Sequence, residues 1–368
     1  MKILVTGAKG FVGKNLTAEL KNREFEVLEA TRKTSKEQLE EYAKDCEFVF
    51  HLAGVNRPKD EKEFFEGNVK FTSELIELLK KHNNKSPIVL TSSIQAVRDN
   101  AYGKSKKAGE DLLFEYAKET GAKVYIYRLP NLFGKWSKPN YNSVVATFCH
   151  NIARDLDIEI HDPEVELTLC YIDDVLDEFM RALEGNPTIE GKYCVVPVTH
   201  KIKLGKLAEL IYSFKESRNN LYVPDMGDEF TKKLYSTYLS YLPKDKFSYE
   251  LKMHSDERGS FTEFLRSKER GQISINVSKP GITKGNHWHH TKNEKFLVVS
   301  GEAIIRLRHL ESDEIIEYHV SGEKLEVVDI PVGYTHSIEN VGDTDLVTVM
   351  WANECFDPDD PDTYYMEV

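Results

Sequence analysis

The first 134 residues alternate short apolar runs with longer stretches whose apolar residues recur every three or four positions. Runs of the first kind predict β-strands, and spacing of the second kind predicts amphipathic helices. The strands are expected at 2–6, 25–31, 46–54, 86–93 and 123–134, and the helices at 11–23, 68–84 and 105–121. Strands that alternate with helices favour a parallel sheet covered on both faces, which is a doubly wound α/β fold of the Rossmann type.

From about residue 255 the pattern changes to short β-rich segments separated by Gly, Asp and Ser. These β-rich segments lie at 271–278, 294–310, 313–320, 323–331 and 346–353. Such closely spaced strands suggest an all-β sandwich or barrel. Because 368 residues are also too many for one hydrophobic core, we expect two domains, 1–243 and 244–368. The acidic ending, FDPDDPDTYYMEV, is expected to be either a solvated tail or an arm that wraps around the second domain.

Composition and charge narrow the class of partner. The net charge of -12 argues against a nucleic-acid binder or an anionic-membrane binder, since both need a basic surface. No apolar run reaches the roughly 20 residues that span a bilayer, and the opening strand pattern leaves no room for a signal peptide. Five scattered cysteines without a CxxC pair favour reduced thiols. We therefore expect a cytoplasmic protein.

A glycine-rich turn, TGAKGFVG at 6–13, connects the first expected strand to the first expected helix. Gly7, Gly10 and Gly13 let the backbone approach a pyrophosphate closely, and the helix N-terminus supplies unpaired amides to bind it. A tight turn without a ligand is the alternative for this motif taken alone. The placement between strand and helix favours a dinucleotide site.

Tyr102 and Lys106 lie four residues apart at the start of a helix and therefore share one face. A lysine ammonium there lowers the pKa of the tyrosine hydroxyl, which can then exchange a proton with a sugar or alcohol oxygen. Upstream, LTSS at 90–93 ends a strand, where a serine hydroxyl can hydrogen-bond the same oxygen. The order of these elements distinguishes them from a chance Tyr–Lys pair.

These motifs resemble the extended short-chain dehydrogenase/reductase family, which contains nucleotide-sugar epimerases, dehydratases and reductases. The shared segments are TGAKGFVG at 6–13, HLAG at 51–54, LTSS at 90–93, YGKSK at 102–106 and RLPNLFG at 128–134. The resemblance covers roughly 1–240. It implies Tyr102 as the catalytic acid/base, Lys106 as its partner and Ser93 as the serine, with Ser92 as the alternative. The residues implied near the cofactor or substrate are Gly7, Gly10, Phe11, Val12, Gly13, Leu52, Ala53, Asn131 and Phe133.

The end of the second strand departs from the NAD-preferring members, in which an acidic residue there binds the ribose hydroxyls. Here the strand runs into Thr31, Arg32 and Lys33, and Glu29 lies inside it. Basic side chains at this position suit the extra phosphate of NADP. We therefore expect NADPH or NADP as the cofactor and Arg32 as a binding residue, with a plain surface charge as the alternative.

The segment GNHWHHTKNE at 285–294 contains a second cluster of chemistry-bearing residues. Alternate residues of a strand share a face, so His287 and His289 point the same way and His290 points the other. Glu294 can return to the same interior from the next strand, and His336 follows a Pro-Gly turn far downstream. Three imidazoles and one carboxylate suit a divalent metal such as zinc, iron, manganese or nickel. Surface or core histidines are the alternative for the HxH pair alone.

The spacing of these residues is similar to that of the cupin superfamily, over roughly 250–368. The first cupin motif is matched by Gly281, His287, His289, Glu294 and Gly301, and most of the second by Pro331, Gly333, His336 and Asn340. The leading glycine of the second motif is missing. The resemblance implies an all-β cupin barrel with one divalent metal, zinc being expected, and with His287, His289, Glu294 and His336 as its ligands.

The segment SDERGSFTEF at 255–264 resembles the DxRGxFxE signature of the sugar-nucleotide 3,5-epimerases, which are also cupins. That likeness implies Arg258 as a ligand of the substrate diphosphate, because a guanidinium matches phosphate oxygens; a turn arginine is the alternative. Those epimerases usually lack the metal, so the full ligand set here is a departure. The proton-transfer base stays open among Lys284, Lys292, Tyr334 and His290, and Lys284 is also a candidate substrate residue.

The whole chain resembles the bifunctional enzymes of capsular polysaccharide synthesis, which join an extended reductase to a metal cupin. In that family the cupin epimerises carbon 3 of a UDP-linked 4-keto-6-deoxy sugar, and the N-terminal domain reduces carbon 4 with NADPH. The product is UDP-N-acetyl-6-deoxy-L-talosamine, the precursor of UDP-N-acetyl-L-fucosamine. A homodimer is expected by the same likeness. A reductase with a structural, dimerising or sugar-binding cupin is the alternative.

Overall fold

The structure, a computed structural model, describes residues 1–56, 60 and 62–368. The chain forms two compact units and crosses between them three times. The first unit consists of Met1–Tyr212 and Asp228–Pro243, and the second of Ser213–Gly227 and Lys244–Val368. Each unit is described by itself below.

The units differ from the predicted domains, 1–243 and 244–368, in the segment Ser213–Gly227. This segment pairs with a strand of the second unit: the Val223 N–H donates to the Arg266 carbonyl, and the Arg266 N–H donates to the Leu221 carbonyl, both at 2.8 Å. The apolar pattern contains no sign of such a long-range pairing. The domain division itself remains a prediction.

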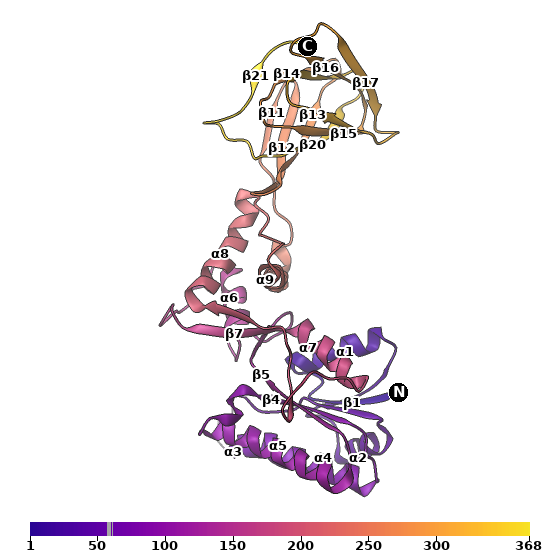
Figure 1. Cartoon of the computed structure of the whole chain (residues 1–368), viewed down its shortest axis with the longest axis vertical. Coiled ribbons are helices and arrows are strands. Elements are labelled where there is room, and N and C mark those ends of the chain that lie inside the picture. Colours follow the sequence, from indigo (N-terminus) through magenta and orange to yellow (C-terminus); the bar gives the residue numbers. More distant parts are fainter. Residues whose placement is uncertain (57–59, 61) are drawn as a thin grey trace. The chain divides into compact units, whose positions relative to one another are not determined.

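The first unit contains a seven-stranded sheet, of which β1, β4 and β5 are labelled in Figure 1. Its strand order is β2-β1-β3-β4-β5-β9-β8, and all pairs are parallel except β8–β9. Its strands are β1 (Lys2–Thr6), β2 (Glu26–Ala30), β3 (Phe48–His51), β4 (Ile88–Ser93), β5 (Val124–Leu129), β8 (Ile189–Glu190) and β9 (Tyr193–Cys194). This is the Rossmann-type parallel sheet that the alternation of elements predicts.

Helices cover both faces of this sheet because its strands are apolar on both sides. Alternate strand residues such as Ile3 and Phe50 belong to a core shared with α1 (Phe11–Asn22) and α7 (Ile172–Leu183). Their neighbours, such as Leu4 and Val49, belong to a second core. That second core is shared with α2 (Lys36–Asp45), α4 (Phe71–Lys81) and α5 (Ala101–Thr120).

The expected single strand at 123–134 is wrong. It divides at Pro130 into β5 and β6 (Asn131–Phe133), and β6 belongs to a separate sheet in the order β10-β7-β6. Proline has no N–H to donate to a sheet ladder, so the strand cannot continue through it. The other members of this sheet are β7 (Glu166–Tyr171) and β10 (His200–Lys203). The other helices of the described residues are α3 (Lys62–Phe65), η1 (Glu66–Lys70), η2 (Ile94–Val97), α6 (Val144–Ile152), α8 (Leu204–Asn220), α9 (Glu229–Leu239) and η3 (Lys244–Lys246).

Residues 253–365 of the second unit form two antiparallel sheets, which confirms the all-β prediction for this part of the chain. The six-stranded sheet runs β11-β12-β13-β20-β15-β18, formed by β11 (Met253–Asp256), β12 (Gly259–Ser267), β13 (Gly271–Ser278), β20 (Leu346–Ala352), β15 (Glu294–Ser300) and β18 (Val327–Ile330). The five-stranded sheet runs β17-β16-β19-β14-β21, formed by β17 (Ile315–Ser321), β16 (Glu302–His309), β19 (Tyr334–Asn340), β14 (Thr283–Trp288) and β21 (Tyr364–Tyr365). An apolar core that includes Phe296, Ile305 and Ile338 fills this unit.

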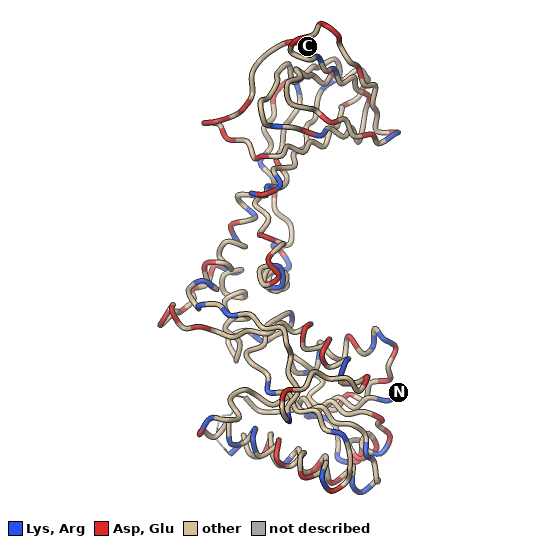
Figure 2. Tube along the Cα trace, viewed as in Figure 1, with Lys and Arg blue, Asp and Glu red and all other residues tan. Residues whose placement is uncertain are grey.

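The acidic ending is an arm and not a free tail. Its strand β21 pairs with β14, with Tyr365 opposite His287 and Tyr364 opposite Trp288. Figure 2 shows acidic residues gathered on this segment, whereas both signs of charge mix along the helices of the first unit. In the part of the chain that the structure describes, no helix has the length and apolar character needed to cross a membrane.

Candidate functional sites

The glycine turn of the first unit lies at the carboxyl edge of the parallel sheet, between β1 and α1. Gly7 has a φ of +71°, and a Cβ there would lie 2.8 Å from the Ala53 nitrogen. A Cβ on Gly13 would lie 2.2 Å from the Gly7 carbonyl oxygen, so helix and turn approach too closely for any side chain. Gly10 begins the helix without a side chain to cap it, which leaves the first amides available to an anion.

The other predicted cofactor residues lie near this turn. The Thr6 hydroxyl accepts from the Ala53 N–H at 3.2 Å, which places Leu52 and Ala53 beside the glycines. The Gly7 N–H donates to the Ala30 carbonyl at 3.0 Å, so the end of β2 also borders the turn. Arg32 follows two residues later and is exposed. The arrangement fits a dinucleotide whose phosphates lie on the α1 N-terminus.

Glu29 is not presented to this edge as a free carboxylate. Lys9 and Lys21 each donate to it at 2.6 Å. These hydrogen bonds, from Lys21 first and then Lys9, keep the Glu29 pKa below its usual value. The charge of Glu29 is therefore neutralised by lysines of the turn and of α1.

Ser93, Tyr102 and Lys106 meet where β4 ends and α5 begins. The Asn100 side chain caps α5 by accepting from the Gly103 N–H at 2.7 Å, which starts the helix early enough to include Tyr102. The pKa of Tyr102 is raised and not lowered as expected from Lys106, because burial raises it and a hydrogen bond with Ser93 offsets only part of this rise. The Tyr102 hydroxyl also donates to Asn56 Oδ1 at 3.2 Å.

Lys106 is half-buried, and its ammonium donates to the Thr91 carbonyl at 3.1 Å. Burial lowers its pKa to about 8, against the opposing effect of the Glu110 carboxylate. Ser92 points away from Tyr102, because its hydroxyl donates to buried Glu110 at 2.6 Å. The geometry therefore favours Ser93 over Ser92 as the serine beside Tyr102.

Three polar residues of this site escaped the sequence analysis. Asn68 fastens the loop after β3, accepting from the Val55 N–H at 2.8 Å and donating to Ser105 Oγ at 3.0 Å. Asn56 reaches Tyr102, as above. Glu110 lies one helical turn beyond Lys106, and this i, i+4 spacing in the sequence indicates that the two side chains are neighbours. Asn56 lies in the loop after β3 and Asn68 in η1, and neither position has a sequence pattern that indicates its contact.

Asn131 and Phe133 on β6 differ in exposure. Asn131 is exposed. Phe133 is fully buried, with ring centroids 5.2 Å from Tyr171 and 5.8 Å from Phe230. Phe133 thus stabilises the small sheet and presents no surface to a ligand.

In the second unit, His287, His289, Glu294 and His336 come together from β14, the turn after it, β15 and β19. One candidate ligand atom from each residue lies within 4.8 Å of all the others. The register pairs His287 directly with His336. Glu294 Oε2 lies 3.3 Å from His336 Nε2 and 3.5 Å from His289 Nε2. His290 lies elsewhere, with ring centroids 4.5 Å from Trp288 and 5.0 Å from Tyr364.

The donor set of this cluster fits a divalent cation. Among the described residues, His289 Nε2, Glu294 Oε2 and both ring nitrogens of His336 are buried without a hydrogen-bond partner. Burial lowers the pKa of His287 to about 4, helped by the neighbouring His336. Burial acts to raise the pKa of Glu294, but the neighbouring His289 and His336 rings outweigh it and bring the value to about 2. Neutral imidazoles and a carboxylate are the forms that bind metal.

The candidate substrate residues of this unit are already engaged. The Arg258 guanidinium is exposed and donates to Asp256 at 2.6 and 3.0 Å. Lys284 is half-buried and donates to Asn276 Oδ1 at 2.8 Å. Lys292 is buried and donates to the Pro361 carbonyl. Binding of a diphosphate by Arg258 would therefore exchange one anionic partner for another.

A parallel sheet with a glycine turn at its edge, beside a Ser–Tyr–Lys set, defines the class of nicotinamide-dependent short-chain dehydrogenases/reductases. The chain belongs to the NAD dependent epimerase/dehydratase family, whose model matches residues 3–195. Residues 254–364 match the polysaccharide biosynthesis C-terminal domain. Members of the family are NAD(P)-dependent enzymes of nucleotide-sugar metabolism, and the chain shares their cofactor edge.

Full-length relatives share both units. The chain is 48% identical to the UDP-2-acetamido-2,6-beta-L-arabino-hexul-4-ose reductase of Pseudomonas aeruginosa, over 100% of this chain and 99% of that protein. It is 59% identical to the crystal structure of the capsular polysaccharide assembling protein CapF from Staphylococcus aureus, which covers 100% of both chains with a TM-score of 0.95. A structure of CapF with the inhibitor 3-isopropenyl-tropolone is 55% identical, again over 100% of both chains, with a TM-score of 0.91.

Proposed function

We propose that this chain is a two-site nucleotide-sugar enzyme of capsular polysaccharide synthesis. Its second unit, as a cupin, epimerises carbon 3 of a UDP-4-keto-6-deoxy-N-acetylhexosamine, and its first unit reduces carbon 4 with NADPH. The product is UDP-N-acetyl-6-deoxy-L-talosamine, the precursor of UDP-N-acetyl-L-fucosamine. The observation that carries the proposal is the 48% identity to a hexul-4-ose reductase over the whole chain, because that alignment spans both units.

In the reduction, the chain supplies the proton and the position of the ketone, and the bound NADPH supplies the hydride. Burial raises the pKa of Tyr102, which favours the protonated hydroxyl that a general acid needs. Ser93, in hydrogen-bond contact with Tyr102, donates to the same ketone oxygen. The Lys106 cation stabilises the tyrosinate that remains after the proton has left.

In the epimerisation, His287, His289, Glu294 and His336 would hold a divalent cation, zinc by our proposal, that stabilises negative charge beside the reacting carbon. Tropolones are bidentate oxygen chelators of divalent cations, so a tropolone inhibitor of CapF supports a metal site in that relative. Lys292 is engaged by the arm and His290 packs on Trp288. Lys284 is engaged by Asn276 in the same way, so these contacts do not choose a proton-transfer base among Lys284, Lys292, Tyr334 and His290.

A second candidate function is a reductase whose C-terminal unit has only a structural, dimerising or sugar-binding role. The name of the Pseudomonas relative favours this second function, since it states a reductase alone. Under either function we propose a homodimer that acts in the cytoplasm, as the family likeness implies.

The two functions are separated by supplying the UDP-4-keto-6-deoxy sugar in deuterated water without NADPH. NMR should show deuterium at carbon 3 with the wild type and with Tyr102→Phe, and none with Glu294→Gln. After NADPH is added, the wild type alone should reduce the sugar, and its product should have the expected stereochemistry. NADPH oxidation without any deuterium at carbon 3 would leave the second candidate standing and contradict the first.

A further inference from the structure

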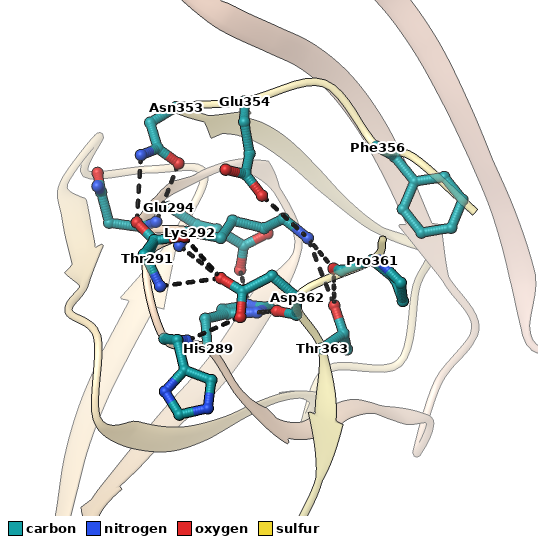
Figure 3. Close-up of polar contacts among 12 residues, drawn as sticks. His289, Thr291, Lys292, Glu294, Asn353, Glu354, Phe356, Pro361, Asp362 and Thr363 are labelled. Carbon is teal, nitrogen blue, oxygen red and sulfur yellow. Dashed lines mark hydrogen bonds and ion pairs between the residues drawn. The ribbon is translucent and has the colours of Figure 1, made fainter. Parts of the chain in front are cut away.

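The C-terminal arm binds the turn that carries the metal-ligand candidate His289 (Figure 3). The Asp362 carboxylate accepts three backbone N–H groups of this turn, from His290 at 3.0 Å, Thr291 at 2.9 Å and Lys292 at 2.8 Å. It also accepts the Thr291 hydroxyl at 3.1 Å. Burial works to raise the pKa of Asp362, but these hydrogen bonds outweigh it and hold the pKa below its usual range. Asp362 is thus a charged acceptor for four donors of one turn.

The backbone of the same residue reaches the ring of His289. The Asp362 carbonyl accepts from His289 Nδ1 at 2.6 Å. A ring that donates through Nδ1 keeps its lone pair on Nε2, and Nε2 lies 3.5 Å from Glu294 within the ligand cluster. Such an outer hydrogen bond fixes the tautomer and the orientation of a metal-binding imidazole.

Other contacts fasten the arm on both sides of Asp362. Buried Lys292 donates to the Pro361 carbonyl and lies 3.9 Å from the Glu354 carboxylate (Figure 3). Upstream, Asn353 Oδ1 accepts from the Asn293 N–H at 3.1 Å. Asp362 itself has a φ of +40°, in a region that a residue with a side chain rarely adopts. The contacts around it hold this backbone, whose carbonyl is directed at His289.

We propose that Asp362 is a positioning residue of the metal centre: its carboxylate clamps the 290–292 turn so that its carbonyl orients the His289 ring for metal binding. The inference rests on the proposed function, in which the His/Glu cluster holds a divalent cation. It adds that the arm, far from the cluster in sequence, sets how tightly that cation is held. Among the described residues, His336 has both ring nitrogens unpaired, so this orienting bond distinguishes His289 from His336.

The test measures metal binding by the purified full-length chain. Three variants are compared with the wild type: Asp362→Ala, Asp362→Asn and, as the matched control, Asp360→Asn on the same arm, where the side chain is exposed. Zn²⁺ affinity is measured by competition with a chromophoric chelator. Asp362→Ala should weaken Zn²⁺ binding by about 10- to 100-fold, as removal of an outer hydrogen bond does. Asp362→Asn should weaken it by about tenfold, because an amide has one acceptor oxygen for the four donors, and Asp360→Asn should match the wild type.

Two further readouts separate positioning from a loss of fold. Amide hydrogen exchange of the metal-free protein should accelerate at Thr291 and Lys292 in Asp362→Ala, with β13 protected as in the wild type. The Co²⁺-loaded variant should show an altered visible absorption spectrum, which reports the coordination geometry. Faster exchange at the turn with unchanged Zn²⁺ affinity and an unchanged Co²⁺ spectrum would overturn the positioning role alone. Wild type that binds Zn²⁺ no better than Glu294→Gln would overturn the metal centre and, with it, this inference.

Discussion

The two candidate sites of this chain differ in how far their polar groups satisfy one another. In the first unit the Lys106 ammonium is bonded to the Thr91 carbonyl, and the Tyr102 hydroxyl to Asn56. In the second unit Glu294 Oε2 and His336 Nε2 are buried without a hydrogen-bond partner among the described residues. A buried polar atom without a partner is destabilising, so we propose that a bound cation completes the second cluster.

The difference teaches which site depends on a bound group for its own stability. The side chains of the first site are positioned by the sheet and by α5, so their arrangement does not depend on a bound ligand. The second brings three imidazoles and a carboxylate together from separate strands, and a cation should stabilise the unit around it. The following predictions test this contrast, from the largest expected effect to the smallest.

Tyr102→Phe should abolish the reduction and spare the second site. Loss of a general acid costs about 10²- to 10⁴-fold in rate, so NADPH oxidation should fall by at least about 100-fold. Deuterium exchange at carbon 3 should continue at the wild-type rate. Tyr42→Phe is the matched control, since Tyr42 packs against the apolar core under the sheet. Equal loss of both activities in Tyr102→Phe would contradict the separation of the sites.

Withdrawal of metal should destabilise the second unit and leave the first unchanged. A cation present at about 100 times its Kd stabilises the folded state by about 2.7 kcal/mol, and a chelator removes that increment. Differential scanning calorimetry should therefore show one transition that moves with chelator and one that does not. Glu294→Gln should lack the shift, whereas Glu302→Gln, exposed on β16, should retain it. A chelator that lowers both transition temperatures would contradict the expectation that only the second unit depends on a bound cation.

Acid should destabilise the first unit through His51, which is buried. Its Nδ1 lies 2.8 Å from the Thr6 hydroxyl oxygen and its Nε2 lies 2.9 Å from the Thr72 hydroxyl oxygen. Burial, and then the Lys106 cation, lower its pKa to about 3. The unfolded chain takes up the proton near pH 6.5 and the folded chain does not. Stability is therefore complete above about pH 6.5 and declines by about 1.4 kcal/mol per pH unit as pH falls towards 3. Denaturant unfolding across this range should show the slope, and His51→Gln should flatten it.

Arg32→Ser should shift cofactor preference without affecting the second site. One exposed charged hydrogen bond to phosphate contributes about 1.4 kcal/mol, or roughly tenfold in affinity. The KM for NADPH should rise by about that factor, while the KM for NADH stays the same. Lys36→Ser at the start of α2 serves as the control for loss of a surface cation. An unchanged KM for NADPH would show that Arg32 is a surface charge without a role in cofactor binding.

Sequence patterns predicted most of the strands, helices and turns of this protein that depend on neighbouring residues alone. The glycine turn and the Tyr–Lys pair follow from one turn and one helix, where sequence spacing and spatial distance are equivalent. Strand 271–278 has the predicted bounds, because its ends coincide with Gly271 and the turn after Ser278. The pattern was less useful at 123–134, since an apolar run does not reveal that Pro130 sends its two halves to different sheets.

The amino-acid sequence by itself determined the two fold classes, the cofactor edge and the set of metal-ligand candidates, because periodicity and motif spacing are properties of the local chain. Tertiary structure alone decided that Ser92 faces Glu110 and that Ser213–Gly227 belongs with the second unit. It also decided that Asp362 reaches His289 across 73 positions. Such contacts form when distant segments pack together to bury apolar surface, and no short stretch of sequence records which partner they meet.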